Sequence, residues 1–127
     1  MAVGMSTATA NSVLDAICNA TAYSLTNVYV QLHTADPGAA GTTAVATETL
    51  RKVVSFGSAA SGAIANDVAV SWTSITGSQD ATHFTLWDAV TAGNFVGSGT
   101  ITANAYTAGD TYTIPIGDLD LTLTVAS

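Results

Sequence analysis

The most regular alternation of apolar and polar positions in this chain lies in residues 27–38. Every second side chain from Val28 to Leu32 is apolar. A period of two is typical of a strand with one face on the core and one wetter face. The strand runs into residues 35–38, Ala-Asp-Pro-Gly, which is turn chemistry. We therefore expect the chain to be organised around this strand and turn.

Shorter alternating segments follow, with small or Gly-containing turns between them. We expect strands over residues 50–56, 68–72, 82–88, 94–102, 112–116 and 119–125. The last is the most regular, because its apolar and polar side chains alternate strictly. Gly97 and Gly99 indicate a bulge or a close approach of the backbone. Many short strands with turns between them predict a mainly β fold, a single antiparallel β-sandwich or barrel-like domain.

One short α-helix is expected before the first strand. Ser12 can cap its free N–H groups, Asp15 favours its positive end, and the helix should end near residues 20–22. Its apolar stripe is formed by Val13, Leu14 and Ile17. We expect Cys18, the one cysteine, to be buried beside this stripe and to form no intrachain disulfide.

The residues before this helix are small and predict an N-terminal arm. We assign residues 1–11 to the arm, which should be mobile on its own, and residues 12–127 to one helix-plus-β-sandwich domain. A length of 127 residues is that of one domain. The first ten residues lack the features of a signal peptide, and no stretch has the ~18 apolar residues of a membrane span. We expect folding in a cytoplasm and no contact with membranes.

The composition is acidic and poor in charge. Charged residues make up 9% and the net charge is −7, against about 25% charged residues in ordinary soluble domains. The only cations are the adjacent Arg51 and Lys52, too few to neutralise a run of phosphates, so direct nucleic-acid binding is not expected. A surface with few charges suits a chain that neighbouring subunits cover.

The side chains that could carry chemistry do not form a catalytic pattern. His33 and His83 lack the short spacing of metal-ligand pairs, and we expect them on wetter strand faces. Gly97-Ser98-Gly99 is too short for a nucleophile elbow. Asp118 and Asp120 share one strand face and are read as solvated acids that discourage edge pairing, although paired carboxylates can hold Ca²⁺. We expect no catalytic residue, no cofactor, no metal and no enzyme activity.

The two tryptophans predict different environments. Trp72 shares its strand face with apolar side chains, which indicates the core. Trp87 lies on the face opposite Phe84 and Leu86, which makes it a candidate for a partner contact. Trp87 together with Tyr29 is also the one pair that could form an aromatic platform for a sugar.

Four motifs in order resemble a family of small tailed-bacteriophage virion proteins. They are VYVQLHTADPG (28–38) with Glu48 after it, VSFGSAASG (54–62), THFTLWDA (82–89) and AGDTYTIPIGDLDLTL (108–123). The family carries a similar "LYVALHTADPG…E" signature, a "VTFGAAS" segment, a "THFGIYDA" strand and an "AGDT…P.G.L.L.L" ending. Where relatives often have Tyr-Ala-Arg before the second motif, this chain has Leu50-Arg51-Lys52. The resemblance spans residues 12–125.

The resemblance implies a structural protein of the virion. Such proteins are usually labelled tail-fibre or minor tail proteins, and some look like minor capsid or decoration proteins. Because this chain lacks a shaft, a coiled coil or a repeat, we expect a capsid decoration protein that stabilises the capsid surface by subunit contacts. The partners would be copies of itself, as a trimer or other homo-oligomer, and the major capsid protein. The residues expected to bind partners are Met1, Ala2, Val3, Met5, Asp36, Pro37 and Trp87.

Two alternatives stay open from the sequence. The chain could be a tail-fibre, minor tail or baseplate component that takes part in host attachment, with other tail proteins as partners. It could instead bind a host glycan, through Trp87 and Tyr29. All of these place the protein in the virion, at the capsid surface or the tail, after synthesis in the host cytoplasm.

Overall fold

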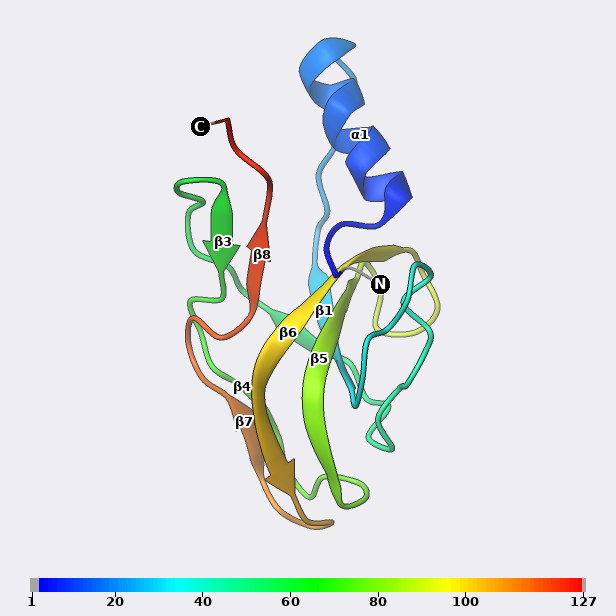
Figure 1. The fold of residues 1–127 in the computed structure, drawn as a ribbon, viewed down its shortest axis with the longest axis vertical. Helices are drawn as coiled ribbons and strands as arrows, with labels where there is room; N and C mark the ends of the chain where they lie inside the picture. Colours follow the sequence, from blue (N-terminus) through cyan, green and yellow to red (C-terminus); the bar gives the residue numbers. More distant parts are fainter. Residues whose placement is uncertain (1–2, 127) are drawn as a thin grey trace.

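The strand at residues 28–33 lies in the middle of a four-stranded antiparallel sheet (Figure 1). The structure is a computed structural model and describes residues 3–126. The strand order is β2-β1-β5-β6. The bounds are β2 Lys52–Val54, β1 Val28–His33, β5 Gln79–Trp87 and β6 Phe95–Tyr106. β5 and β6 are the longest strands, and their pairing is irregular near Ala81 and Leu86.

Two short antiparallel pairs complete the β structure. β4, Val70–Trp72, pairs with β7, Tyr112–Ile114, and β3, Ala63–Ala65, pairs with β8, Asp120–Thr122. The prediction of a mainly β, antiparallel domain with one short helix is confirmed, and the strands of residues 3–126 do not close into a barrel. No strand was predicted at β3, because its three residues, Ala-Ile-Ala, are too few to form a recognisable alternating pattern.

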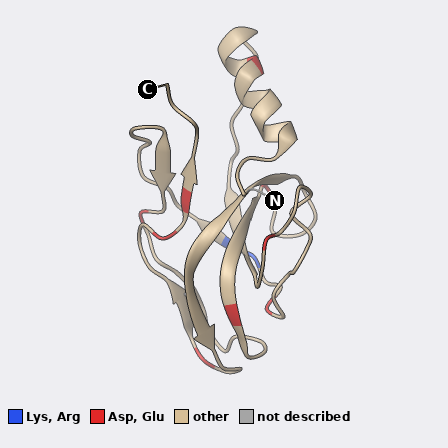
Figure 2. Ribbon diagram, viewed as in Figure 1, with Lys and Arg blue, Asp and Glu red and all other residues tan. Residues whose placement is uncertain are grey.

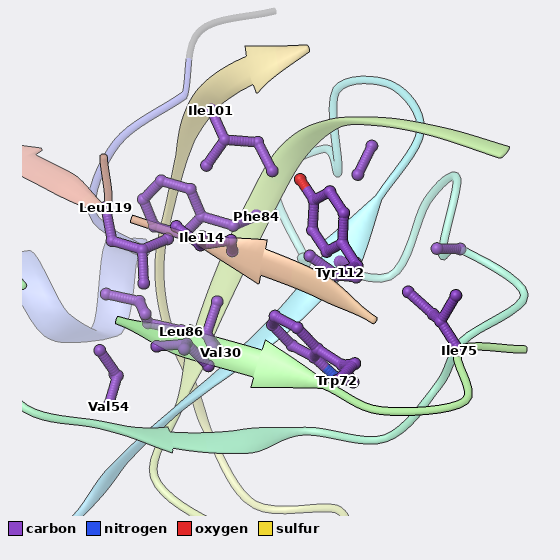
Figure 3. Close-up of a cluster of buried hydrophobic side chains, with 14 of the residues drawn as sticks. Val30, Val54, Trp72, Ile75, Phe84, Leu86, Ile101, Tyr112, Ile114 and Leu119 are labelled. Atoms are coloured by element: carbon purple, nitrogen blue, oxygen red, sulfur yellow. The ribbon is translucent and has the colours of Figure 1, made fainter. Parts of the chain in front are cut away.

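The hydrophobic core lies between the four-stranded sheet and the β4–β7 pair (Figure 3). The sheet contributes Val30, Leu32, Phe84, Leu86 and Ile101, and the β4–β7 pair contributes Val70, Trp72, Tyr112 and Ile114. Leu119, just before β8, also belongs to this core. Trp72 is 1% exposed, and its Nε1 donates to the carbonyl oxygen of Leu50 at 2.8 Å. The core position predicted for Trp72 is therefore confirmed. Val68, expected on the same strand face, lies before β4 and is exposed.

Two glycines allow β6 to pack closely against its neighbours, as the sequence predicted. A Cβ at Gly99 would lie 2.6 Å from the ring of Phe84 and 3.2 Å from the carbonyl oxygen of Asp120. A Cβ at Gly97 would lie 3.1 Å from the carbonyl oxygen of Gly4. These contacts bring β8 and the N-terminal segment onto β6.

The helix begins earlier than the sequence predicted. α1 spans Thr7–Cys18, and Ser6 is its N-cap, accepting a hydrogen bond from the Thr9 N–H at 3.1 Å. The expected start at Ser12 is wrong, because Ser6 caps the N–H groups one turn and a half earlier. Cys18 is exposed rather than buried, because the C-terminal half of α1 projects away from the sheets (Figure 1).

The part of the expected arm that the structure describes is attached to its own chain. The Ser6 N–H donates to the Val96 carbonyl at 2.9 Å, and the Ser98 N–H donates to the Gly4 carbonyl at 2.7 Å. Residues 4–6 therefore add to the outer edge of β6. Met1 and Ala2 lie outside the described residues.

The C-terminal strand is shorter than its pattern predicted. β8 ends at Thr122, and beyond it Leu123 and Val125 are 49% and 58% exposed. Only Leu119 and, in part, Leu121 reach the core. The apolar face expected over residues 119–125 is thus divided into a covered half and an uncovered half.

Candidate functional site

The signature at residues 28–38 continues into a segment that lies along the edge of β1. The Thr34 N–H donates to the Ala44 carbonyl at 2.9 Å, and the Ala46 N–H donates to the Leu32 carbonyl at 3.0 Å. His33 pairs with Val45 in the same ladder. Residues 44–46 therefore lie along the same edge of β1 as β2, but at the opposite end of the strand.

His33 is the buried centre of a hydrogen-bond chain. Its side chain is 0% exposed, its Nδ1 lies 2.8 Å from the Thr43 carbonyl oxygen, and its Nε2 lies 2.8 Å from Thr85 Oγ1. Because a carbonyl only accepts, Nδ1 carries the proton, and Nε2 accepts from the Thr85 hydroxyl. Thr85 Oγ1 in turn accepts from Trp87 Nε1 at 2.7 Å. The wetter environment expected for His33 is wrong, since residues 43–45 cover that face.

This environment favours the neutral imidazole. Burial lowers the pKa of His33, the hydrogen bond to the Thr43 carbonyl raises it, and the nearby His83 lowers it again. Burial is the largest of these causes. His33 therefore joins β1, β5 and the following segment as an uncharged group.

Asp36 and Pro37 build the turn that follows β1. Asp36 Oδ1 accepts from the Gly38 N–H at 2.8 Å, and the Pro37 carbonyl accepts from the Thr43 N–H at 2.9 Å. Pro37 is fully buried, and Gly38 has a φ of +78° that suits glycine. The binding of a partner by Asp36 and Pro37 stays a prediction, and the Pro37 ring offers no free surface.

Glu48 fastens the far end of the same segment. Its carboxylate is 8% exposed and accepts from the Leu50 N–H at 3.2 Å and from the Thr76 N–H at 3.1 Å. These two donors belong to different connections, one before β2 and one before β5. The carboxylate thus holds two loops together. The sequence could not indicate this role, because it shows only that the loop of small residues contains one acid.

Trp87 is covered by its own chain, contrary to the exposed position we expected. The ring is 7% exposed. The guanidinium carbon of Arg51 lies 4.1 Å from its centroid, and the Phe95 ring lies 5.5 Å away. Arg51 and Phe95 together leave little of the ring free, and the binding of a partner or a sugar by Trp87 stays a prediction. Tyr29 is half-buried in β1, directly opposite Trp87 in the ladder.

The hairpin between β5 and β6 is closed by Asp88 and Asn94. Asp88 Oδ1 accepts from the Asn94 N–H at 2.7 Å, and Oδ2 accepts from Asn94 Nδ2 at 2.9 Å. These hydrogen bonds, that from the Asn94 backbone foremost, lower the pKa of the Asp88 carboxyl. Arg51 Nη1 donates to the carbonyls of Ala89 and Ala92 in the same hairpin.

The remaining acids do not gather into a site. Figure 2 shows acidic residues spread over the molecule and the two basic residues side by side near its middle. Asp118 accepts from the Thr102 hydroxyl at 3.0 Å, and Asp120 is exposed. Within residues 3–126 no group of three or more His, Cys, Asp or Glu side chains is placed to hold a metal ion.

Among residues 3–126, no helix has the length and apolar character needed to cross a membrane.

The structure thus separates the predicted site residues. Val3 and Met5 lie beside the outer edge of β6, whereas Asp36, Pro37 and Trp87 belong to the bonded region around β1 and β5. No local pattern signals the role of Arg51 as a clamp on Trp87, because the two residues lie far apart in the chain.

Comparison with known protein families shows which family the chain matches. The model of a family described as podophage GP4 fiber I protein gp80 matches residues 4–122, while a comparison with curated proteins finds none. The matched range begins in the segment that pairs with β6 and ends with β8, so it contains every strand and the whole of α1. It also contains the signature, Glu48 and Arg51. The chain therefore belongs to the podophage GP4 fiber I protein gp80 family of phage fibre proteins.

Proposed function

We propose that this chain is a structural subunit of a phage tail fibre and that it works through contacts with copies of itself and with other tail proteins, not through catalysis. The family membership supports the tail-fibre reading over the capsid decoration protein that we first expected. The capsid expectation rested on the lack of a shaft in this domain. That argument is weaker than a family match over nearly the whole chain.

The observation that carries this proposal is the use of the signature residues within the fold. His33, Asp36 and Glu48 each direct their polar atoms at groups of the same chain. Arg51 does the same with the carbonyls of the β5–β6 hairpin. Residues that chemistry would need free are engaged in holding loops to the sheet, as expected of a scaffold.

The covering of Trp87 argues against a sugar platform at that residue. A stacking platform needs an open aromatic face, whereas Trp87 is 7% exposed and packs against Arg51 and Phe95. We therefore place host attachment, where the fibre takes part in it, in the assembled fibre and not in this ring.

Electron microscopy of virions decorated with Fab fragments raised against the purified protein tests the proposal. Fab density on fibres, with bare heads, is the expected result. Fab density repeated over the head would overturn the fibre assignment in favour of capsid decoration. Virions made without the gene product provide the control for Fab specificity, and they should lack the labelled fibre.

A further inference from the structure

The helix α1 presents an apolar stripe that the described chain covers only in part. The stripe consists of Ala10, Val13, Leu14 and Ile17. Leu14 is 59% exposed and Ile17 is 73% exposed. The polar pair Asp15 and Asn19, joined by a hydrogen bond of 2.9 Å, lies on the opposite side of the helix by its 3.6-residue period.

A groove runs between this stripe and the C-terminal segment. Its volume is about 540 Å³. Besides the stripe, it is lined by residues 122–124 of the C-terminal segment and residues 3–5 of the N-terminal segment. The N-terminal and C-terminal segments, distant in sequence, thus lie beside the same helix (Figure 1). We call the stripe and the groove together the α1 face.

The helix needs more contact than the described chain provides. It has 12 residues, of which only Thr9 is buried, and it meets the sheets through β6 at its N-terminal end. Isolated helices of this length are marginal in water, and most of their stability comes from packing an apolar face. Leu14 and Ile17 would supply that packing if another surface covered them.

We propose that the α1 face is the surface on which a second copy of this chain binds, an inference that rests on the fibre function proposed above. The charges restrict where a second copy can bind. The chain has nine acids and two cations, and Arg51 is engaged with Trp87 and the β5–β6 hairpin. Two copies therefore repel one another over most of their surface, whereas none of the described residues that line the α1 face is charged.

The shape of the face also suits a second copy. It carries an exposed apolar ridge, Leu14 and Ile17, directly beside an apolar groove. A surface with both features can bind its own image, with the ridge of one copy in the groove of the other. A second copy already has an uncharged ridge that matches the groove, whereas a partner of different sequence would have to supply one.

Sedimentation of the purified protein with two matched variants tests the proposal. Ile17→Asp puts a charge in the α1 face, and Ile116→Asp makes the same change at an isoleucine that is 67% exposed outside it. We expect wild type and Ile116→Asp to self-associate alike, and Ile17→Asp to raise the dissociation constant at least about tenfold. Far-UV circular dichroism identifies any variant that loses its fold, and Leu14→Asp then provides a second test.

Salt and spin labels give independent readouts. Raising the salt from about 0.01 to about 1 M shortens the Debye length from about 30 to about 3 Å and should strengthen association, because it screens the repulsion of acidic copies. A spin label on the exposed Cys18 should show a short label-to-label distance in the assembly. A wild type that stays monomeric, an Ile17→Asp variant that associates like wild type, or labels far apart would overturn the proposal.

The outcome is separable from that of the proposed function. A chain that is found in fibres but does not associate through α1 would overturn only the α1 face. A chain that associates through α1 but is found on the head would overturn only the fibre assignment.

Discussion

The guanidinium carbon of Arg51 lies 4.1 Å from the centre of the Trp87 ring. The same guanidinium donates from Nη1 to the Ala89 and Ala92 carbonyls at 2.9 and 2.7 Å. Arg51 precedes β2, and Trp87 ends β5, with β1 between them in the sheet. One side chain therefore spans three strands and closes the β5–β6 hairpin over the aromatic ring.

Arg51→Met should destabilise the fold. The change keeps the aliphatic stem but removes the cation–π contact and leaves two carbonyls without their donor. Hydrogen bonds to charged groups contribute about 1.5–3 kcal/mol, so we expect a loss of about 1–3 kcal/mol in the free energy of unfolding by urea. Lys52→Met removes the same charge from the next residue, for which no side-chain hydrogen bond is found among the described residues, and should cost less than about 0.5 kcal/mol. Equal losses in the two variants would contradict the clamp.

Acidification should weaken the fold through His33. The pKa of the folded imidazole is lowered by burial from its ordinary value of 6.5. The stability is therefore fully present above pH 6.5 and declines as the pH falls through that value towards the lowered pKa, because only the unfolded state gains the proton readily. Urea unfolding between about pH 7.5 and pH 5 should show this decline.

Two histidine variants assign that decline. His33→Gln should be less stable at neutral pH, because it disturbs the bonds to Thr43 and Thr85, but its stability should depend less on pH. His83→Gln, at the position that faces His33 across the ladder, should keep most of the wild-type dependence. If His33→Gln kept the pH dependence of the wild type, the effect would have to come from other groups.

Glu48→Gln should loosen the contact between two loops. The carboxylate accepts two backbone N–H groups, and an amide would turn one acceptor into a donor facing a donor. A buried donor left unpaired costs about 1–3 kcal/mol, and we expect a loss of that size in thermal or urea unfolding. The matched change Asp80→Asn, at an exposed acid of β5, should have little effect. A Glu48→Gln protein as stable as wild type would show that these two bonds do not hold the loops.

Gly99→Ala should be poorly tolerated. The added methyl would lie 2.6 Å from the Phe84 ring and 3.2 Å from the Asp120 carbonyl oxygen, so β8 or the ring must shift. Overpacking of this kind costs about 1–3 kcal/mol. Gly57→Ala is the control, because its new methyl would be 3.8 Å from its nearest neighbour, the Asp67 Cβ. Thermal unfolding compares the two, and equal midpoints would argue against tight β6–β8 packing.

Local patterns predicted the strands well where one face is apolar and the other wet or small. The period of two at Val28–His33 and at residues 82–88 identified β1 and most of β5, and their facing residues Val30 and Leu86 are buried partners. The resemblance drawn from four motifs led to the correct family. The strand predictions and the family resemblance both depend on short stretches of sequence, which can be read without knowing the fold.

The wrong predictions concern side chains whose burial depends on residues distant in the sequence, which no local pattern can indicate. Trp87 and His33 lie on the face that alternation marks as wetter, yet Arg51 and residues 43–45 cover them. Conversely, Leu123 and Val125 continue an apolar alternation and are uncovered in this chain. The helix start was misplaced because Ser6 and Ser12 are both acceptable caps, and only the pairing of residues 4–6 with β6 selects Ser6.

A cryo-electron microscopy reconstruction of the virion, with this fold placed in the density, would test both the fibre function and the self-association through α1. We expect the chain to lie in a tail fibre and the α1 stripe, with Leu14 and Ile17, to pack against another copy. Density for the fold at symmetry axes of the head, with α1 against the capsid shell, would contradict both the fibre function and the self-association face.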